Sequence, residues 1–172
     1  MADRNNHYER AFAALLRERR VVTIPVDETR RALDQDGTLK SLDFVCIAPS
    51  GAVLLVEVKG RRLRGAGLEN WVTDDDVESL GRWGRNFGPN AAPLFAFVYD
   101  LPDETAGRGF VDTVASGGRR YGCLAISPSD LSPLLRRRSP KWQTSGAPRG
   151  AFRAAARPFS EWLSRPPLAT GA

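Results

Sequence analysis

Two charged residues stand at the end of an apolar run. Residues 54–60 are LLVEVKG, in which apolar residues lead to Glu57 and Lys59 and the run stops at Gly60. A strand this apolar is expected to be buried, and ionised Glu and Lys are rarely fully buried unless they are paired. The two charges therefore need either a partner or a chemical function.

The loop that precedes this strand predicts which residue lies opposite it. Pro49-Ser50-Gly51 separates two predicted strands, 41–48 and 52–59. Proline at the first loop position and glycine at the third fit a type I turn followed by a left-handed residue. Such a loop sets Ala48 opposite Ala52 and fixes the register of the whole hairpin.

In that register Asp43 lies opposite Glu57, on the face that also carries Lys59, because residues i and i+2 of a strand point the same way. Two opposed carboxylates repel by about 0.2–1 kcal/mol, which favours a cation between them. Mg²⁺ prefers oxygen ligands and takes one or two protein carboxylates. Lys59 could then hold a water or a phosphate oxygen beside an ion that makes water more acidic. The alternative is a solvated strand end, with Asp43 paired to a nearby arginine.

Hydrophobic periodicity predicts the elements that position these residues. An amphipathic helix is expected over 6–20, with Tyr8, Phe12 and Leu15 on one face. Strands are expected over 21–26, 41–48, 52–59, 93–100 and 119–126, further helices from Thr73 to about 87, from Ser127 or Ser129 to Leu135 and near 159–163, and a turn-rich connection over 27–38. The order αβββαβ implies an α/β fold, a central mixed β-sheet flanked by helices.

Composition and charge limit the class of protein. The chain has 172 residues, 42% of them apolar, which fits one globular domain. It contains no apolar run of membrane-spanning length and no signal-peptide core in MADRNNHYER, so a cytoplasmic location without membrane contact is expected. Cys46 and Cys123 lie in apolar runs, which is typical of small core residues.

The charge is unevenly distributed. Residues 1–104 carry a net charge of −3, whereas residues 105–172 carry +8. A basic C-terminal part beside an acidic N-terminal part suggests a polyanionic partner. The alternative is coding bias, since 22 of the 25 basic residues are arginine.

Asp43, followed after thirteen residues by Glu57-Val58-Lys59 at the end of an apolar strand, resembles the PD-(D/E)xK nuclease superfamily. The resemblance covers roughly the first 100 residues and includes the order αβββαβ. It implies a restriction-endonuclease-like core, taken here as residues 1–126, with a basic C-terminal extension at 127–172. It also implies hydrolysis of phosphodiester bonds with Mg²⁺ or Mn²⁺ as cofactor and nucleic acid as partner, DNA being favoured over RNA. Many nucleases of this fold act as dimers, so a homodimer is an open expectation.

The resemblance assigns roles to individual residues. It implies that Asp43 and Glu57 hold the metal and that Lys59 assists the attacking water. Members similar to archaeal Holliday junction resolvases add a metal-binding glutamate on the first helix, and Glu9 matches that position. The alternative for Glu9 is a capping box with Asn6.

The chain also departs from the family pattern. Leu42 stands where many members have proline, and residues 74–87 contain no glutamine, which many members carry on the second helix. The second departure favours an alternative function, a catalytically inactive nuclease-like module that binds nucleic acid or a protein.

Basic residues that follow the predicted strand 52–59 and basic residues in the C-terminal extension are candidates for nucleic-acid contact, since arginine binds phosphate with a bidentate fork. They are Arg61, Arg62, Arg64, Arg136, Arg137, Arg138 and Lys141. Trp142 lies beside the densest run, and aromatic and basic residues together can clamp a single strand. Solvated loops, or a surface helix end packed by Trp142, are the alternatives.

Two further residues are candidate accessory groups. His7 stands at a helix start and could orient water or phosphate, although a solvated histidine is the alternative. Glu28, next to Asp27, could reach the same site or pair with neighbouring arginines. Residues 74–76 are three aspartates, which we interpret as first-turn acids stabilised by the helix dipole rather than as a metal cluster.

Overall fold

The computed structural model describes residues 6–27, 31–65 and 67–164, and its main sheet has seven strands. They are β1 (Val22–Pro25), β4 (Phe44–Ile47), β5 (Val53–Arg62), β7 (Ala91–Leu101), β8 (Asp112–Ser116), β9 (Arg119–Ile126) and β12 (Arg157–Pro158). The spatial order is β1-β4-β5-β7-β9-β12, and β8 also pairs with β9. Among the described residues, β5 and β7 form the one parallel pair of this sheet, and the other pairs are antiparallel. The sheet is therefore mixed, as predicted.

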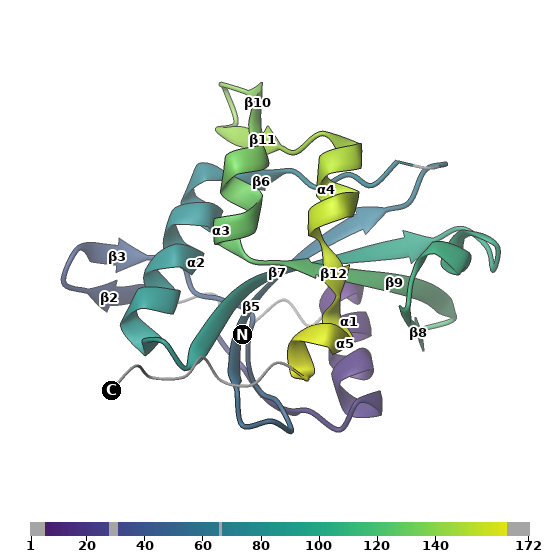
Figure 1. Ribbon diagram of the computed structural model, residues 1–172, viewed down its shortest axis with the longest axis horizontal. Helices are drawn as coiled ribbons and strands as arrows, with labels where there is room; N and C mark the ends of the chain where they lie inside the picture. The colour runs from purple at the N-terminus through teal and green to yellow at the C-terminus, as the bar shows by residue number, and fades with distance from the viewer. Residues whose placement is uncertain (1–5, 28–30, 66, 165–172) are drawn as a thin grey trace.

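Helices cover both faces of the sheet (Figure 1). They are α1 (His7–Glu18), α2 (Asp74–Phe87), α3 (Pro128–Leu131), α4 (Arg149–Ala155) and α5 (Phe159–Leu163), with 3₁₀ segments at Ala106–Gly109 and Ser132–Leu134. α1 and α5 share one core cluster, in which the rings of Phe12 and Phe159 lie 5.0 Å apart. α2, α3 and α4 contribute to a second cluster, where Phe152 meets Phe97 at 5.0 Å. The predicted order αβββαβ is confirmed by α1, β1, β4, β5, α2 and β7.

The predicted amphipathic helix packs its apolar face onto β5. Asn6 caps it by accepting a 3.1 Å hydrogen bond from the Tyr8 amide. Phe12 and Leu16 pack in the same cluster as Val56. Gly60 lets the helix approach closely, because a Cβ atom at that position would overlap the Tyr8 ring. The first turn of α1 is thereby placed over the carboxyl-terminal half of β5.

The β4–β5 hairpin has the predicted register. The Ala48 amide donates to the Ala52 carbonyl at 2.8 Å, and Gly51 is left-handed with φ +84°. Pairing then runs from Ile47 opposite Val53 to Phe44 opposite Val56. The loop chemistry therefore determines which residues of the two strands meet.

Several strands lie where the sequence predicted none. β2 (Ala32–Asp34) and β3 (Gly37–Leu39) form a hairpin inside the connection expected to be turn-rich. β8 joins β9 through Gly117 and Gly118, both with positive φ, as a two-residue hairpin turn requires. A three-stranded sheet is formed by β10 (Arg136–Ser139), β11 (Thr144–Gly146) and β6 (Val72–Thr73).

The C-terminal extension packs against the rest of the chain. β12 pairs with β9, and β11 pairs with β6. Phe152, Phe159 and Trp162 are buried in the two main core clusters. Within the described part of the chain, none of the helices is long and apolar enough to cross a membrane.

Candidate functional site

Strand β5, which contains Glu57 and Lys59, carries its apolar residues on one face and these charged residues on the other. Val56 and Val58 lie in the core cluster under α1. Glu57 and Lys59 alternate with them and therefore lie on the other face. Glu57 is 5% exposed, and its Oε1 accepts a hydrogen bond from Lys59 Nζ at 2.9 Å. The predicted pair of charges is thus in contact, with Glu57 buried and Lys59 half-buried.

Two residues from other elements complete a cluster of four charges. Lys40, between β3 and β4, places Nζ 2.5 Å from Glu57 Oε1 and 2.7 Å from Asp76 Oδ1. Asp76 Oδ2 lies 2.7 Å from Lys59 Nζ. Two carboxylates and two ammonium groups therefore alternate around a closed ring of ion pairs. Neither Lys40 nor Asp76 was predicted from the sequence as part of the site.

Asp76 reaches the cluster because of its place in α2. It is the third helical residue, and it forms a capping box with Thr73, each side chain accepting a hydrogen bond from the other's amide. The prediction that Asp76 lies in the first turn is therefore confirmed. A further signal was available, since Leu80 and Trp83 follow at i+4 and i+7 and place Asp76 on the face that packs against the protein.

The electrostatics of the cluster keep Lys40 and Asp76 ionised. Burial by itself would raise the pKa of Asp76, but the ammonium groups of Lys59 and Lys40 outweigh it and lower that pKa well below its usual value. Burial would lower the pKa of Lys40, but Glu57 and Asp76 outweigh it and raise that pKa. A cavity of only about 10 Å³ lies beside the cluster, which is room for about one water.

Asp43 lies beside the cluster, immediately before β4, and is 5% exposed. Its amide donates to the Val56 carbonyl at 3.0 Å, so regular pairing with β5 ends here. Its Oδ2 accepts a 2.5 Å hydrogen bond from the Val58 amide, the peptide group that follows Glu57. Asp43 and Glu57 are therefore neighbours across the strand pair, and both are buried.

Two buried carboxylates are available near the ring of ion pairs as oxygen ligands for a divalent ion. Among the residues that the structure describes, no group of three or more His, Cys, Asp or Glu side chains is arranged to hold a metal ion. Glu9, on α1, accepts a hydrogen bond from the Asn6 side chain. Asp43 and Glu57 remain as a pair of buried carboxylates, which fits the one or two protein carboxylates that Mg²⁺ takes. The ligand role of Glu9 stays a prediction.

The arginines that follow the site strand differ in exposure. Arg61 is buried; its guanidinium stacks 3.9 Å from the Trp71 ring centroid and donates to the carbonyls of Gly60 and Trp71. Burial also lowers the pKa of Arg61. Arg62 and Arg64 are exposed. Only the latter two of these arginines therefore present their side chains to solvent.

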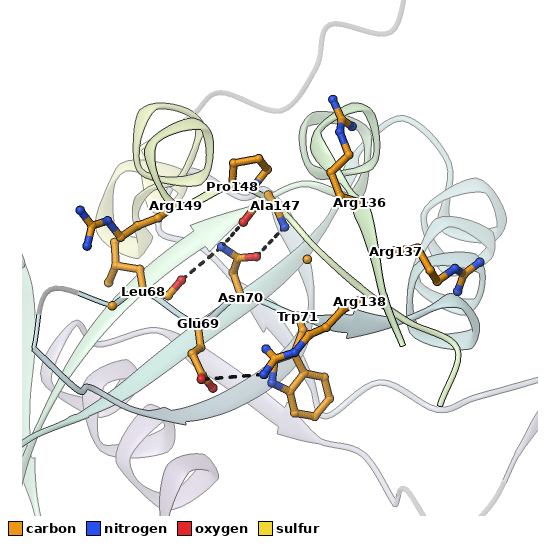
Figure 2. Close-up of a pocket in the computed structure, with 12 residues that line it drawn as sticks. Leu68, Glu69, Asn70, Trp71, Arg136, Arg137, Arg138, Ala147, Pro148 and Arg149 are labelled. Carbon is orange, nitrogen blue, oxygen red and sulfur yellow. Dashed lines mark hydrogen bonds and ion pairs between the residues drawn. The ribbon is translucent and has the colours of Figure 1, made fainter. Parts of the chain in front are cut away.

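The basic residues of the extension lie on a hairpin. Arg136, Arg137 and Arg138 are exposed on β10, and Lys141 is exposed in the turn that follows. An open groove of about 480 Å³ lies beside these arginines (Figure 2). Arg136, Arg137 and Arg138 therefore line one groove, and Lys141 lies in the turn that follows β10.

His7, the accessory candidate on α1, contacts Tyr121 on β9. His7 Nδ1 is 2.9 Å from the Tyr121 hydroxyl, and burial together with Arg119 lowers the pKa of His7. Asp27 is exposed, and Glu28 lies outside the described residues. Asp75, in the first turn of α2, forms an ion pair at 3.5 Å with Arg31. The accessory roles of His7 and Glu28 stay predictions.

No family model and no curated protein matches this chain. Among solved structures, it is similar to the Holliday junction resolvase Hjc of Archaeoglobus fulgidus, an archaeal hyperthermophile. The TM-score is 0.54 at 17% identity, over 91% of this chain and 98% of that chain. The chain has the restriction-endonuclease-like fold. The predicted fold class is thus confirmed, and the likeness extends beyond the first 100 residues on which the resemblance was based. In this restriction-endonuclease-like chain, the ring of ion pairs lies between β5 and α2.

Proposed function

We propose that the chain is a metal-dependent nuclease that hydrolyses phosphodiester bonds, with DNA as the expected substrate. One observation carries the proposal. Asp43, immediately before β4, and Glu57, on β5, are both buried, with the Lys59 ammonium 2.9 Å from Glu57, in a fold shared with a Holliday junction resolvase. Buried carboxylates beside a lysine are costly for a fold unless they are paired or have a function.

In this proposal the residues divide the chemistry among themselves. Asp43 and Glu57 hold Mg²⁺ or Mn²⁺, with Glu9 as a further candidate ligand. When bound, the ion supplies Lewis acidity and a more acidic water beside the scissile phosphate. Lys59 orients the attacking water and stabilises negative charge on the phosphoryl oxygens. The water oxygen would form a bond to phosphorus as it loses a proton to solvent, while the bond to the leaving ester oxygen breaks and that oxygen takes up a proton from solvent.

The exposed basic residues would hold the substrate. Arg62 and Arg64 continue from the site strand, while Arg136 and its neighbours on β10 extend the basic surface. Phosphate contacts of this kind fix the position of a nucleic acid without reading its sequence. A cytoplasmic location and a homodimer remain expectations of the proposal.

The test is cleavage of DNA and RNA panels with Mg²⁺ or Mn²⁺. Glu57→Gln and Lys59→Met should each lower the cleavage rate by about 10²-fold or more, as loss of a group that stabilises transition-state charge does. Glu78→Gln is the matched control, because Glu78 is 71% exposed on the same helix as Asp76. Cleavage that survives both site substitutions at the control rate contradicts the proposal.

A second function is favoured by a separate observation. Glu57 and Asp76 are each held between the ammonium groups of Lys40 and Lys59, so the cluster is already neutralised. This arrangement suits a nuclease-like module that binds nucleic acid or a protein without cutting. Calorimetric titration with Mn²⁺ separates the two functions. Metal uptake that is lost in Glu57→Gln supports the nuclease, whereas no uptake by the wild-type chain supports the binding module.

A further inference from the structure

The β10–β11 hairpin exposes an aromatic ring among basic side chains. Trp142, in the turn between the two strands, is 69% exposed. The ammonium group of Lys141 lies 5.2 Å from the centroid of its ring. Isolated exposed tryptophans are uncommon, since the ring is a large apolar surface that usually packs or binds a partner.

The turn that carries Trp142 is held in place by the protein. Gln143 has a left-handed backbone, with φ +46°, which is uncommon for a residue other than glycine. Its amide donates to the Pro140 carbonyl at 3.2 Å, and its carbonyl accepts from the Asp74 amide at 3.0 Å. The turn is thus fastened to the first turn of α2. A turn held in this way loses less conformational freedom when its side chain binds a partner.

A basic groove lies along the same hairpin. It has a volume of about 480 Å³, and Figure 2 shows side chains of Arg136, Arg138 and Arg149 around it, with Asn70 at its centre. Asn70 bridges the two walls, because it donates to the Ala147 carbonyl at 3.1 Å and accepts from the Ala147 amide at 2.7 Å. The groove is therefore part of the fold rather than a gap between loose loops.

Cations exceed acids on this surface. Arg136, Arg137, Arg138, Lys141 and Arg149 lie on the hairpin and groove. Arg137 pairs with Asp74 at 2.8 Å, and Arg138 lies 4.0 Å from Glu69. These pairs are half exposed and therefore weak, so a polyanion can compete for the arginines. The charge selects an anionic partner.

The surface is connected to the candidate site by two elements. β11 pairs with β6, where Thr144 lies opposite Thr73, the N-cap of the helix that carries Asp76. Arg61, two residues beyond Lys59 on β5, stacks on Trp71, which lines the groove. The groove and the ring of ion pairs are therefore joined through β6 and through the Arg61–Trp71 stack.

We propose that the β10–β11 hairpin binds an unpaired segment of nucleic acid next to the site. Trp142 stacks on an exposed base, while Arg136, Arg138 and Arg149 hold phosphates in the groove. A duplex needs phosphate contacts only, whereas a fixed exposed ring finds its partner in an unstacked base. This inference rests on the proposed function and deepens it, since it names nucleic acid with an unpaired segment as the substrate class.

The test is fluorescence anisotropy with a labelled single-stranded DNA and its duplex, both with EDTA so that no cleavage occurs. Trp142→Leu should weaken single-strand binding by about 5- to 100-fold, the range expected for losing one stacked base. It should leave duplex binding unchanged, and Trp142→Phe should restore most of the single-strand affinity. Phe87→Leu, which changes another exposed ring at the far end of α2, is the control and should bind as the wild type does.

The inference is overturned if Trp142→Leu binds the single-stranded DNA as tightly as the wild type does. The inference is also overturned if the wild-type chain binds neither DNA but binds poly-glutamate, because the surface would then fit an acidic protein. The result is independent of the cleavage test. If single-strand binding depends on Trp142 but the chain cleaves no nucleic acid, the nuclease proposal fails and the hairpin site stands. If the chain cleaves nucleic acid but binding does not depend on Trp142, the nuclease proposal stands and the hairpin site fails.

Discussion

Alternate residues of β5 enter two different environments. Leu54, Val56 and Val58 pack under α1 in an apolar cluster, and the chain supplies nothing but shape and apolar surface there. Glu57 and Lys59 face α2, where they meet Lys40 and Asp76 in a ring of ion pairs. One strand thus packs a conventional core with one face, and with the other it contributes two of the four charges in a buried or half-buried ring.

The difference between the faces concerns how much each depends on its partners. An apolar side chain gains from leaving water whatever apolar group it meets. A buried charge needs a specific opposite charge at hydrogen-bonding distance, and loss of one partner leaves the other desolvated. The apolar face should therefore tolerate substitution gradually, whereas the charged face should respond to the loss of any one member.

The largest effect on stability is expected from Asp76→Ala. This change leaves two ammonium groups facing Glu57 alone and removes the capping box of α2. Breaking a buried ion pair costs about 3–5 kcal/mol. The free energy of unfolding, measured by urea denaturation, should fall by that amount. Asp75→Ala is the control, since Asp75 is half exposed on the same turn, and an equal loss there would contradict the special role of Asp76.

On the apolar face, Leu54→Ala should destabilise the chain by about 2–5 kcal/mol through lost burial and a residual cavity. The same urea measurement gives the value. Any cleavage or metal binding per folded molecule should stay at the wild-type level, because Leu54 points away from the charges. A selective loss of activity in folded Leu54→Ala would show that the two faces are not independent.

The apolar face and the hairpin register could be predicted from the sequence, since both depend on local chemistry. Pro49 and Gly51 specify the loop, and the loop specifies the register. Helical periodicity specifies which residues of α1 are buried. Gly117-Gly118 is a similar local signal, since two adjacent glycines suit the turn between β8 and β9.

The rest of the charged face depends on tertiary structure. Lys40 lies on a connection with no periodicity, and only the folded chain brings it to Glu57. β10 and β11 contain arginine and serine without apolar alternation, so pairing with β6 rather than intrinsic preference makes them strands. The local signal of Asp76 as a helix cap was sufficient to place it in the first turn but not to reveal its second set of partners.

Lys40→Met removes one cation from the ring while leaving both carboxylates. Lys40 is 35% exposed, so the cost in stability should be smaller than for Asp76→Ala. With one competing ammonium gone, Mn²⁺ should bind more tightly. The unfolding temperature should accordingly rise more with added Mn²⁺ in Lys40→Met than in the wild type. Lys141→Met is the matched control, and an identical Mn²⁺ response in all three chains would show that Lys40 does not compete with a metal.

The smallest effect concerns an ion pair outside the site. Arg82 hydrogen-bonds Asp34 on the β2–β3 hairpin and, with Asn86, lowers the pKa of Asp34 from 3.8 to about 2. Because the folded-state pKa is depressed, the stabilisation is complete above about pH 4 and is lost as the pH falls towards 2. Asp34→Asn should therefore be less stable than the wild type at pH 7, and the difference between them should shrink over that interval. Thermal unfolding at a series of pH values measures it, and a constant difference down to pH 2 would show that this pair adds nothing to the acid sensitivity of the fold.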